Sequence, residues 1–383
     1  MKTFCFKLYH SQHNKKLHRQ INAAGLIYNH CIALHKRYYR LFKKYLDKNK
    51  LQKHLVKLKN QEKFSYIREL GSQAVQDITD RIDRGYNLFW RNREHKLRAS
   101  PPNFKRVRNY KSFTLKQAGW KLNDKTGMIR LGKKWYHYFK SRNIEGKIKT
   151  VTIKRDPVGD IYIYIVSDVS TEEVIGRTGK SVGYDFGLKI FLTSSDGNDI
   201  ISPLFFARSV KIIKNKSNNL SRKHEGSNNR RRAKLELARA YRKIFNQRKD
   251  FHFKTARIIC EGYAIVCLED LNLKGMQKRY GRKISDLGFY NFVQILKYEA
   301  KKFGTQIVFI DRWYASSQIC NNCGYKNSEL KDVRIREWNC PKCNKHHDRD
   351  RNAAINIHRV GASTLRGDKI RPDYPYGQSG VCC

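Results

Sequence analysis

Four cysteines near the C-terminus constrain the fold more than any other feature of this 383-residue chain. They form two pairs, Cys320 with Cys323 and Cys340 with Cys343; two residues separate the members of each pair and sixteen separate the pairs. This spacing is typical of a zinc ribbon that binds one structural Zn²⁺ through four thiolates. Because four thiolates complete the coordination sphere, His346 and His347 are not needed as ligands and no catalytic water is expected on this metal.

The charge of the chain predicts a nucleic acid as partner. Its 80 Lys and Arg residues exceed its 33 Asp and Glu residues, which gives a formal net charge of +47. Seventeen of the basic residues lie between positions 208 and 257, among only three acids. A solvated helix face is the alternative interpretation of such a run, but the imbalance of the whole chain favours phosphate binding. Arg230, Arg231, Arg232 and Arg248 are candidate nucleic-acid contacts.

No segment of the sequence resembles a signal peptide or a membrane span. Residues 1–12 alternate polar and apolar side chains, and no stretch approaches eighteen apolar residues, so we expect a soluble protein that stays inside the cell. Cys5, Cys31, Cys260 and Cys267 fall within apolar patterns, which predicts reduced thiols packed as small hydrophobic side chains. The terminal Cys382 and Cys383 are assigned no role.

Hydrophobic periodicity divides the chain into a helical, a β and an α/β part. Apolar residues recur at three- and four-residue steps over 17–31 and 67–89, which predicts amphipathic helices in a bundle over residues 13–95. From Pro101, turn residues and alternating segments predict a small β-barrel or sandwich. Beyond a polar linker at 170–180, alternating strands and helices predict an α/β sheet. Its expected elements are strands within 182–192, 264–268 and 306–310, a basic helical stretch at 214–259 broken at 226–229, and a helix at 287–303.

Three acids occupy the ends of these elements. Asp185 lies in the first strand, Glu269 follows the strand at 264–268, and Asp350 precedes a helix that we expect to begin near Asn352. Acids at strand ends can converge on one edge of a sheet and hold two divalent cations for phosphodiester hydrolysis. Taken singly, each could instead form a turn, solvate a strand end or cap a helix. The rival acids are Asp196, Asp270, Asp311 and Asp348, and spacing alone does not decide between Asp348 and Asp350.

Two further groups of side chains suit either binding or simple packing. Gln73 and Gln76 share a face of an expected helix and could read adenine edges in a major groove, although glutamines more often solvate a helix. Near the ribbon, cations alternate with flat rings, which suits phosphates and stacked bases; packing of the tryptophans against the ribbon is an equal alternative. These ribbon residues are Arg312, Trp313, Tyr314, Arg334, Arg336 and Trp338.

Six segments, in this order, resemble the TnpB family of transposon-encoded RNA-guided nucleases (IS200/IS605-type), which is related to the Cas12 effectors. Together they span nearly the whole chain. They are PPNFKRVRNYKSFTL at 101–115, GKIKTVTIKRDPVGDIYI at 146–163, VGYDFGLKIFLTSSDG at 182–197, LSRKHEGSNNRRRAKLELARAYRKIFNQRKDFHFKTA at 220–256, VCLEDLNLKGM at 266–276, and SSQICNNCGY at 316–325 continuing to WNCPKCNKHHDRDRNAAINI at 338–357.

The resemblance implies a RuvC centre of Asp185, Glu269 and Asp350 with two catalytic Mg²⁺ ions, for which Mn²⁺ can substitute, and it favours Asp350 over Asp348. It also implies a multidomain α+β fold. The implied domains are a wedge β-barrel split over 1–12 and 101–178, a helical recognition domain at 13–100, an RNase H-like (RuvC) α/β domain at 179–318 and 345–362, a zinc-ribbon, target-nucleic-acid-binding insertion at 319–344, and a tail at 363–383 that we expect to be disordered.

The implied partners are a guide RNA encoded at the end of the protein's own element and a double-stranded DNA target beside a short recognition motif. Base pairing would read the sequence, while the protein holds the heteroduplex by its backbone and shape. The expected location is the prokaryotic cytoplasm, at the nucleoid when DNA is bound. A non-cleaving nucleic-acid-binding regulator and a strand-joining transposase are the alternatives; the intact set of acids argues against the first.

Overall fold

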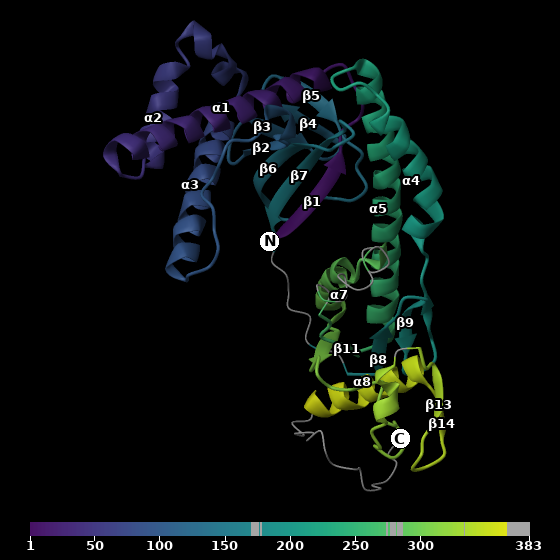
Figure 1. Ribbon diagram of the computed structural model, residues 1–383. Helices are drawn as coiled ribbons and strands as arrows, with labels where there is room; N and C mark the ends of the chain where they lie inside the picture. The colour runs from purple at the N-terminus through teal and green to yellow at the C-terminus, as the bar shows by residue number, and fades with distance from the viewer. Residues whose placement is uncertain are drawn as a thin grey trace. The chain divides into compact units, whose positions relative to one another are not determined.

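The computed structural model describes residues 1–169, 176, 178–272, 275, 281, 286–332 and 334–365. The chain divides into two compact units, Met1–Thr171 and Glu172–Cys383 (Figure 1). Most of the tail expected to be disordered, with Cys382 and Cys383, lies outside the described residues. Within the described ranges, no helix is long and apolar enough to cross a membrane.

Helices α1 (Asn14–Phe42), α2 (Lys48–Leu58) and α3 (Ser72–Glu94) belong to the first unit, with the short 3₁₀ segments η1 (Glu62–Glu69) and η2 (Val107–Asn109). The expectation of one helical pattern from Ile67 to Phe89 is wrong at its start. Ile67 belongs to η1, the backbone of Leu70 is extended, and Gly71 precedes the first turn of α3. The extended backbone of Leu70 and of Gly71, the N-cap of α3, separates η1 from α3 and interrupts the pattern there.

Two antiparallel sheets complete the first unit. One has the strand order β1-β7-β6-β2, from Lys2–Lys7, Ile161–Asp168, Lys147–Arg155 and Ser112–Leu115; the other is β3-β4-β5, from Trp120–Asn123, Met128–Leu131 and Lys134–His137. Helix α3 covers the edge strand β2, since Asp77 accepts the backbone N–H of Thr114 at 3.2 Å and Arg81 donates to the Ser112 carbonyl at 3.0 Å. Apolar side chains of the helices and the sheets form one continuous core.

The second unit is built on a five-stranded mixed sheet with the order β10-β9-β8-β11-β12. Strands β8 (Ser181–Phe186), β11 (Ile265–Glu269) and β12 (Gln306–Ile310) are parallel, while β9 (Ile190–Ser194) and β10 (Ile200–Ile201) run antiparallel to their neighbours. Because β8, β11 and β12 are parallel, their carboxyl ends lie at the same edge of the sheet. This is the α/β sheet that the alternation of elements predicts.

Helices cover both faces of this sheet. Val182 and Val266 pack with residues of α5 (Asn228–Gly262) and α7 (Phe289–Phe303) on one face, while Cys267 packs against Ile357 of α8 (Arg349–Leu365) on the other. Helix α8 approaches closely at Gly183, where a Cβ atom would lie 2.5 Å from the Ala354 carbonyl oxygen. Only glycine at this strand position lets the helix backbone come so near.

Helix α4 (Phe205–Ser221) precedes α5. The predicted break in the basic stretch is confirmed, but it spans residues 222–227 rather than 226–229, because α5 begins at Asn228. Ser227 begins α5 by accepting the N–H of Arg230 at 3.1 Å. The start of α4 is held by Asp286, which accepts the N–H groups of Phe206 and Ala207 at 3.0 and 3.2 Å. The zinc-ribbon region contributes η3 (Ser328–Lys331) and the antiparallel pair β13 (Glu337–Asn339) and β14 (His346–Asp348).

Candidate functional site

Two of the predicted acids face the same helix from neighbouring strands. Side chains alternate between the faces of a strand. Gly183 of β8 lies against α8, and Cys267 of β11 packs against Ile357 of that helix. Asp185 and Glu269 lie two residues further along these parallel strands, so they face α8 as well, at the carboxyl edge of the sheet.

Asp350 reaches this edge from α8. The helix begins at Arg349 rather than near Asn352, so Asp350 lies in its first turn. Asp348 caps the helix by accepting a backbone N–H of the first turn at 2.8 Å. The carboxylate of Asp350 forms an ion pair with Arg336, whose Nη1 lies 3.0 Å from Oδ1. The structure thus gives Asp348 the capping role that could have belonged to Asp350.

Electrostatics indicates that both other acids act on Asp185. Burial contributes most to raising the pKa of Asp185 well above its usual range, and repulsion by Glu269 and Asp350 adds to it. Burial, with repulsion by Asp270, raises the pKa of Glu269 to about 7. Half-buried carboxylates in mutual repulsion are stabilised by a cation between them, because an opposite charge favours their ionised form. The arrangement therefore suits a divalent cation with oxygen ligands.

The rival acids have other partners. Burial alone would raise the pKa of Asp196, but hydrogen bonds from neighbouring hydroxyl groups lower it to about 2. Asp270 forms an ion pair with Arg312, whose Nε lies 3.1 Å from Oδ2. Asp311 accepts a backbone N–H in its own turn at 2.7 Å. Each of these carboxylates is held by a local contact of its own.

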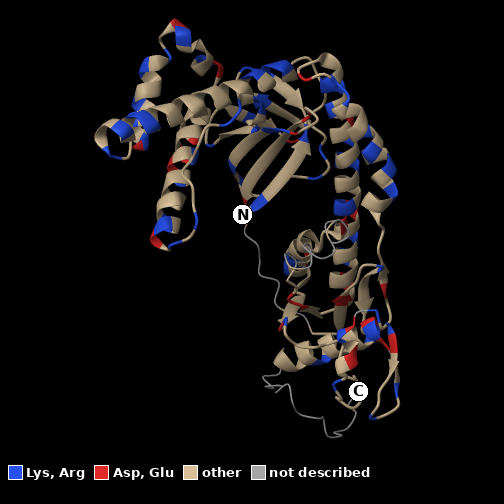
Figure 2. Cartoon of the chain, in the orientation of Figure 1, with Lys and Arg blue, Asp and Glu red and all other residues tan. Residues whose placement is uncertain are grey.

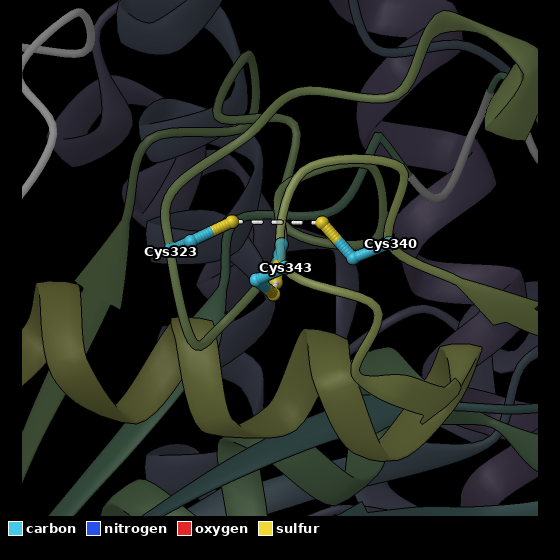
Figure 3. Close-up of side chains that lie close together, drawn as sticks. Cys323, Cys340 and Cys343 are labelled. Atoms are coloured by element: carbon cyan, nitrogen blue, oxygen red, sulfur yellow. Dashed lines mark hydrogen bonds between the residues drawn. The ribbon is translucent and has the colours of Figure 1, made fainter.

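The four cysteines gather into one cluster, in which the Sγ atoms all lie within 4.8 Å of one another. Figure 3 shows Cys323, Cys340 and Cys343 together. The sulfurs of Cys320 and Cys343 are 3.7 Å apart, and those of Cys323 and Cys340 are 3.5 Å apart. Four thiolates bound tetrahedrally at about 2.3 Å would place their sulfurs about 3.8 Å apart. The residues present therefore fit a tetrahedral zinc ion.

Each cysteine pair lies in the same kind of tight turn. The N–H of Gly324 donates to the Cys320 carbonyl at 3.0 Å, and the N–H of Asn344 donates to the Cys340 carbonyl at 2.8 Å. Gly324 and Asn344 have φ values of +75° and +56°, in the left-handed region that Gly and Asn adopt most readily. His347 also reaches the cluster, with Nε2 3.1 Å from the sulfur of Cys320. An N–H on that nitrogen would donate to the thiolate, a supporting role that sequence reasoning did not find.

Buried polar side chains connect the ribbon to α8. Asn352 donates to the carbonyl of Ile319 at 2.7 Å and accepts the N–H of Asn321 at 2.9 Å. Asn356, one turn further along, donates to the carbonyl of Ser316 at 2.8 Å. The helix that contains the third acid is therefore anchored on the first cysteine turn.

Lys and Arg residues lie along α4 and α5 (Figure 2). Arg231 and Arg232 are exposed near the start of α5. Arg230 donates to a backbone carbonyl in the preceding turn at 2.7 Å, and Arg248 forms an ion pair with Asp286 at 3.1 Å. These internal contacts favour Arg231 and Arg232 over Arg230 and Arg248 as phosphate contacts, although binding by all four stays a prediction.

The glutamines and tryptophans differ in exposure. Gln73 is half-exposed and Gln76 is exposed in the first turns of α3, where base reading stays a prediction. Trp338 is buried in the ribbon and packs against His347, with ring centroids 4.8 Å apart. Trp313, by contrast, is exposed to solvent. The packing alternative therefore holds for Trp338 and not for Trp313.

Two family models match the chain. The OrfB_IS605 model, described as "Probable transposase", matches residues 164–280, and the model described as "Cas12f1-like, TNB domain" matches residues 289–357. A solved structure, "Cryo-EM structure of the Cas12f1-sgRNA-target DNA complex", aligns with a TM-score of 0.55 at 16% identity and covers 91% of this chain and 83% of that one. At this identity the likeness concerns the fold alone.

Two curated relatives cover most of the chain. A "Putative RNA-guided DNA endonuclease" of Streptomyces pristinaespiralis is 30% identical over 339 residues, which are 85% of this chain and 81% of the relative. The "Putative RNA-guided DNA endonuclease InsQ" of Escherichia coli (strain K12) is 27% identical over 96% of this chain and 94% of its own length. With the matching motifs and the arrangement of acids and cysteines, this similarity means that the chain belongs to the TnpB family.

Proposed function

We propose that this protein is an RNA-guided DNA endonuclease with a RuvC-type active site. The proposal rests on the placement of Asp185 and Glu269 at the ends of neighbouring parallel strands, on the face that α8 covers, and on the action of the Asp350 charge upon Asp185. The names of the full-length relatives support guide-dependent DNA cutting. A mixed five-stranded sheet covered on both faces by helices supports the RNase H-like assignment for this unit.

Asp185, Glu269 and Asp350 are the residues that would hold two Mg²⁺ ions, or Mn²⁺ in their place. When bound, such ions activate a water and stabilise the leaving oxygen in phosphodiester hydrolysis. The fit rests on the donor set, since carboxylate oxygens are the ligands that Mg²⁺ prefers. Arg336, held at Asp350 by its ion pair, supplies a positive charge beside the acids where a phosphate would enter.

The partners are a guide RNA and a double-stranded DNA target. A formal charge of +47 supports binding of two polyanions, which reduce the self-repulsion of the chain. Helices at 13–100 would form the recognition part, the sheets of the first unit the wedge, and 319–344 the target-nucleic-acid-binding insertion. Guide pairing would supply the sequence specificity, so this chain needs few base-specific contacts.

Cleavage by the purified ribonucleoprotein tests the proposal. With Mg²⁺ and a duplex that matches the co-purified RNA, the wild-type protein is expected to cut DNA, while Asp185→Ala and Glu269→Ala abolish cutting and still retain the RNA. Asp250→Ala is the control, because this exposed carboxylate of α5 pairs only with the neighbouring Lys254 among its described contacts. Equal cutting by the Asp185 and Glu269 variants would contradict the site assignment. An RNA-bound wild-type protein that cuts no matched duplex would favour the silent-regulator alternative.

A further inference from the structure

Trp313 is the most exposed aromatic side chain among the residues that the structure describes, with 86% of its surface accessible. Single exposed apolar residues are common and alone assign nothing. Trp313 differs from such residues because positively charged side chains lie near it and hydrogen bonds hold the backbone of its turn. The sequence motif around it combines rings and cations, and Trp338, the other tryptophan of that motif, is already explained by packing.

The turn that presents Trp313 is held in place on both sides. The N–H of Trp313 donates to Oδ1 of Asp311 at 2.7 Å, and the N–H of Tyr314 donates to the Asp311 carbonyl at 3.1 Å. The preceding Arg312 is tied to Asp270 by its ion pair, with Nε 3.1 Å from Oδ2. The indole is therefore presented by an ordered turn, which reduces the entropy lost when a ligand binds.

This turn follows β12 at the same edge of the sheet as the acids. Ile310, the last residue of β12, is the register partner of Glu269, and the N–H of Asp270 donates to its carbonyl at 3.3 Å. Trp313 follows three residues later, a distance of at most about 11 Å along the chain. Neighbouring strands are about 4.8 Å apart. The indole thus lies within reach of a strand held at the acidic site.

We propose that Trp313 is a stacking site for an unpaired nucleobase of the DNA strand that enters the acidic site, an inference that rests on the proposed function. An indole stacks on the face of any base, and nearby guanidinium groups attract the phosphates that link the bases. The ligand must be unpaired and unstacked, because bases within a duplex already cover both of their faces. Arg312 and Arg336 supply positive charge near this edge, because both guanidinium groups stay exposed although each pairs with an acid, unlike the half-buried Arg248.

Fluorescence of 2-aminopurine, which is quenched when this base analogue stacks, tests the proposal. The ribonucleoprotein carrying Glu269→Gln, which keeps the DNA uncut, would bind matched duplexes with 2-aminopurine at successive positions of each strand. Quenching is expected at one or two adjacent positions, to be lost with Trp313→Ala and kept with Trp313→Phe. In the protein with intact acids, Trp313→Ala should slow cutting about tenfold, within the range for loss of one base–aromatic stack. Tyr290→Ala, which removes another exposed ring of the same unit, is the control and should change neither reading.

The proposal would be overturned if Trp313→Ala left the 2-aminopurine signal unchanged at every position. If the ribonucleoprotein binds no matched duplex, the proposed function fails instead, and single-stranded 2-aminopurine oligonucleotides then test the stacking site directly. Quenching that depends on Trp313 in that assay would support a single-strand site without guided cutting. Quenching that Trp313→Ala does not alter would exclude it.

Discussion

Asp348 and Asp350 lie two residues apart, yet the start of α8 gives them different environments. Asp348 precedes the helix and accepts a backbone N–H of its first turn at 2.8 Å. Asp350 lies inside that turn, where its charge raises the pKa of Asp185 and its carboxylate pairs with Arg336. The same residue type therefore serves helix capping at one position and the acidic site at the other.

This difference predicts different effects of two alanine substitutions, one on cutting and one on stability. Asp350→Ala should abolish DNA cutting and leave RNA binding intact, because it removes one of the three converging carboxylates. Asp348→Ala should lower the free energy of unfolding by about 1 kcal/mol through loss of the cap, with cutting largely retained. Cleavage rates and thermal unfolding of the two ribonucleoproteins measure both effects. The assignment of the third acid would be wrong if Asp348→Ala abolished cutting and Asp350→Ala did not.

Spacing alone could not separate these two acids, because the local sequence offers a possible cap at either position. At the start of α8, Arg349 makes a tertiary contact by donating to the backbone carbonyl of Asp332 at 2.6 Å. Such contacts join segments far apart in sequence and leave no periodic pattern. The cysteine cluster is different, since its spacing directly reports the two tight turns that zinc binding requires.

At the scale of elements, His252 links α5 to the segment before α7. Its ring lies 2.9 Å from the Leu287 carbonyl through Nε2 and stacks on Phe191 at 5.7 Å. Burial lowers the pKa of His252 from 6.5 to about 4 in the folded protein. The unfolded chain therefore binds a proton more readily between these pH values, and protonation favours unfolding.

The free energy of unfolding of this unit should thus fall as pH falls from about 6.5 to 4, by up to about 1.4 kcal/mol per pH unit from this one group. His252→Gln keeps a donor for the Leu287 carbonyl but does not titrate, so the variant should have a shallower pH dependence. Hydrogen exchange of α5 and α7 amides at pH 7, 6 and 5 measures the difference. Parallel pH dependences of the two proteins would contradict the prediction.

Elements with clear periodicity were predictable and short ones were not. The strands at 264–268 and 306–310 and the break in the basic stretch agree with β11, β12 and the turn between α4 and α5. Helix α2 and the three four-residue strands β3, β4 and β5 were not foreseen. In α2, four lysines dilute the apolar signal. The short strands are stabilised mainly by cross-strand partners that a single sequence does not reveal.

At the scale of the whole molecule, hydrogen bonds join the cysteine cluster to the helix that contains Asp350. Asn352 and Asn356 bind the backbone around the first cysteine turn, and the same helix holds Asp350. Zinc removal should therefore loosen the anchor of α8 and reduce DNA cutting, while RNA binding, which the basic surface supports, persists. Treating the ribonucleoprotein with a zinc chelator, then restoring Mg²⁺, and comparing it with Cys340→Ser measures this coupling. Unchanged fold and unchanged cutting without zinc would show that the cluster has no structural role.

The large positive charge predicts RNA binding that weakens steeply with salt. Each phosphate contact contributes about −0.7 to −0.9 to the slope of log K against log salt concentration, since binding releases condensed counterions. Arg231 and Arg232 are exposed, so Arg231→Ala and Arg232→Ala should each reduce the magnitude of this slope by about 1. Arg230→Ala is the matched comparison, because Arg230 is already hydrogen-bonded within the protein at 2.7 Å, so this variant should change the slope less than the other two. Guide RNA affinities measured at several salt concentrations give the slope for each variant. Equal slopes for all three variants would exclude Arg231 and Arg232 as phosphate contacts.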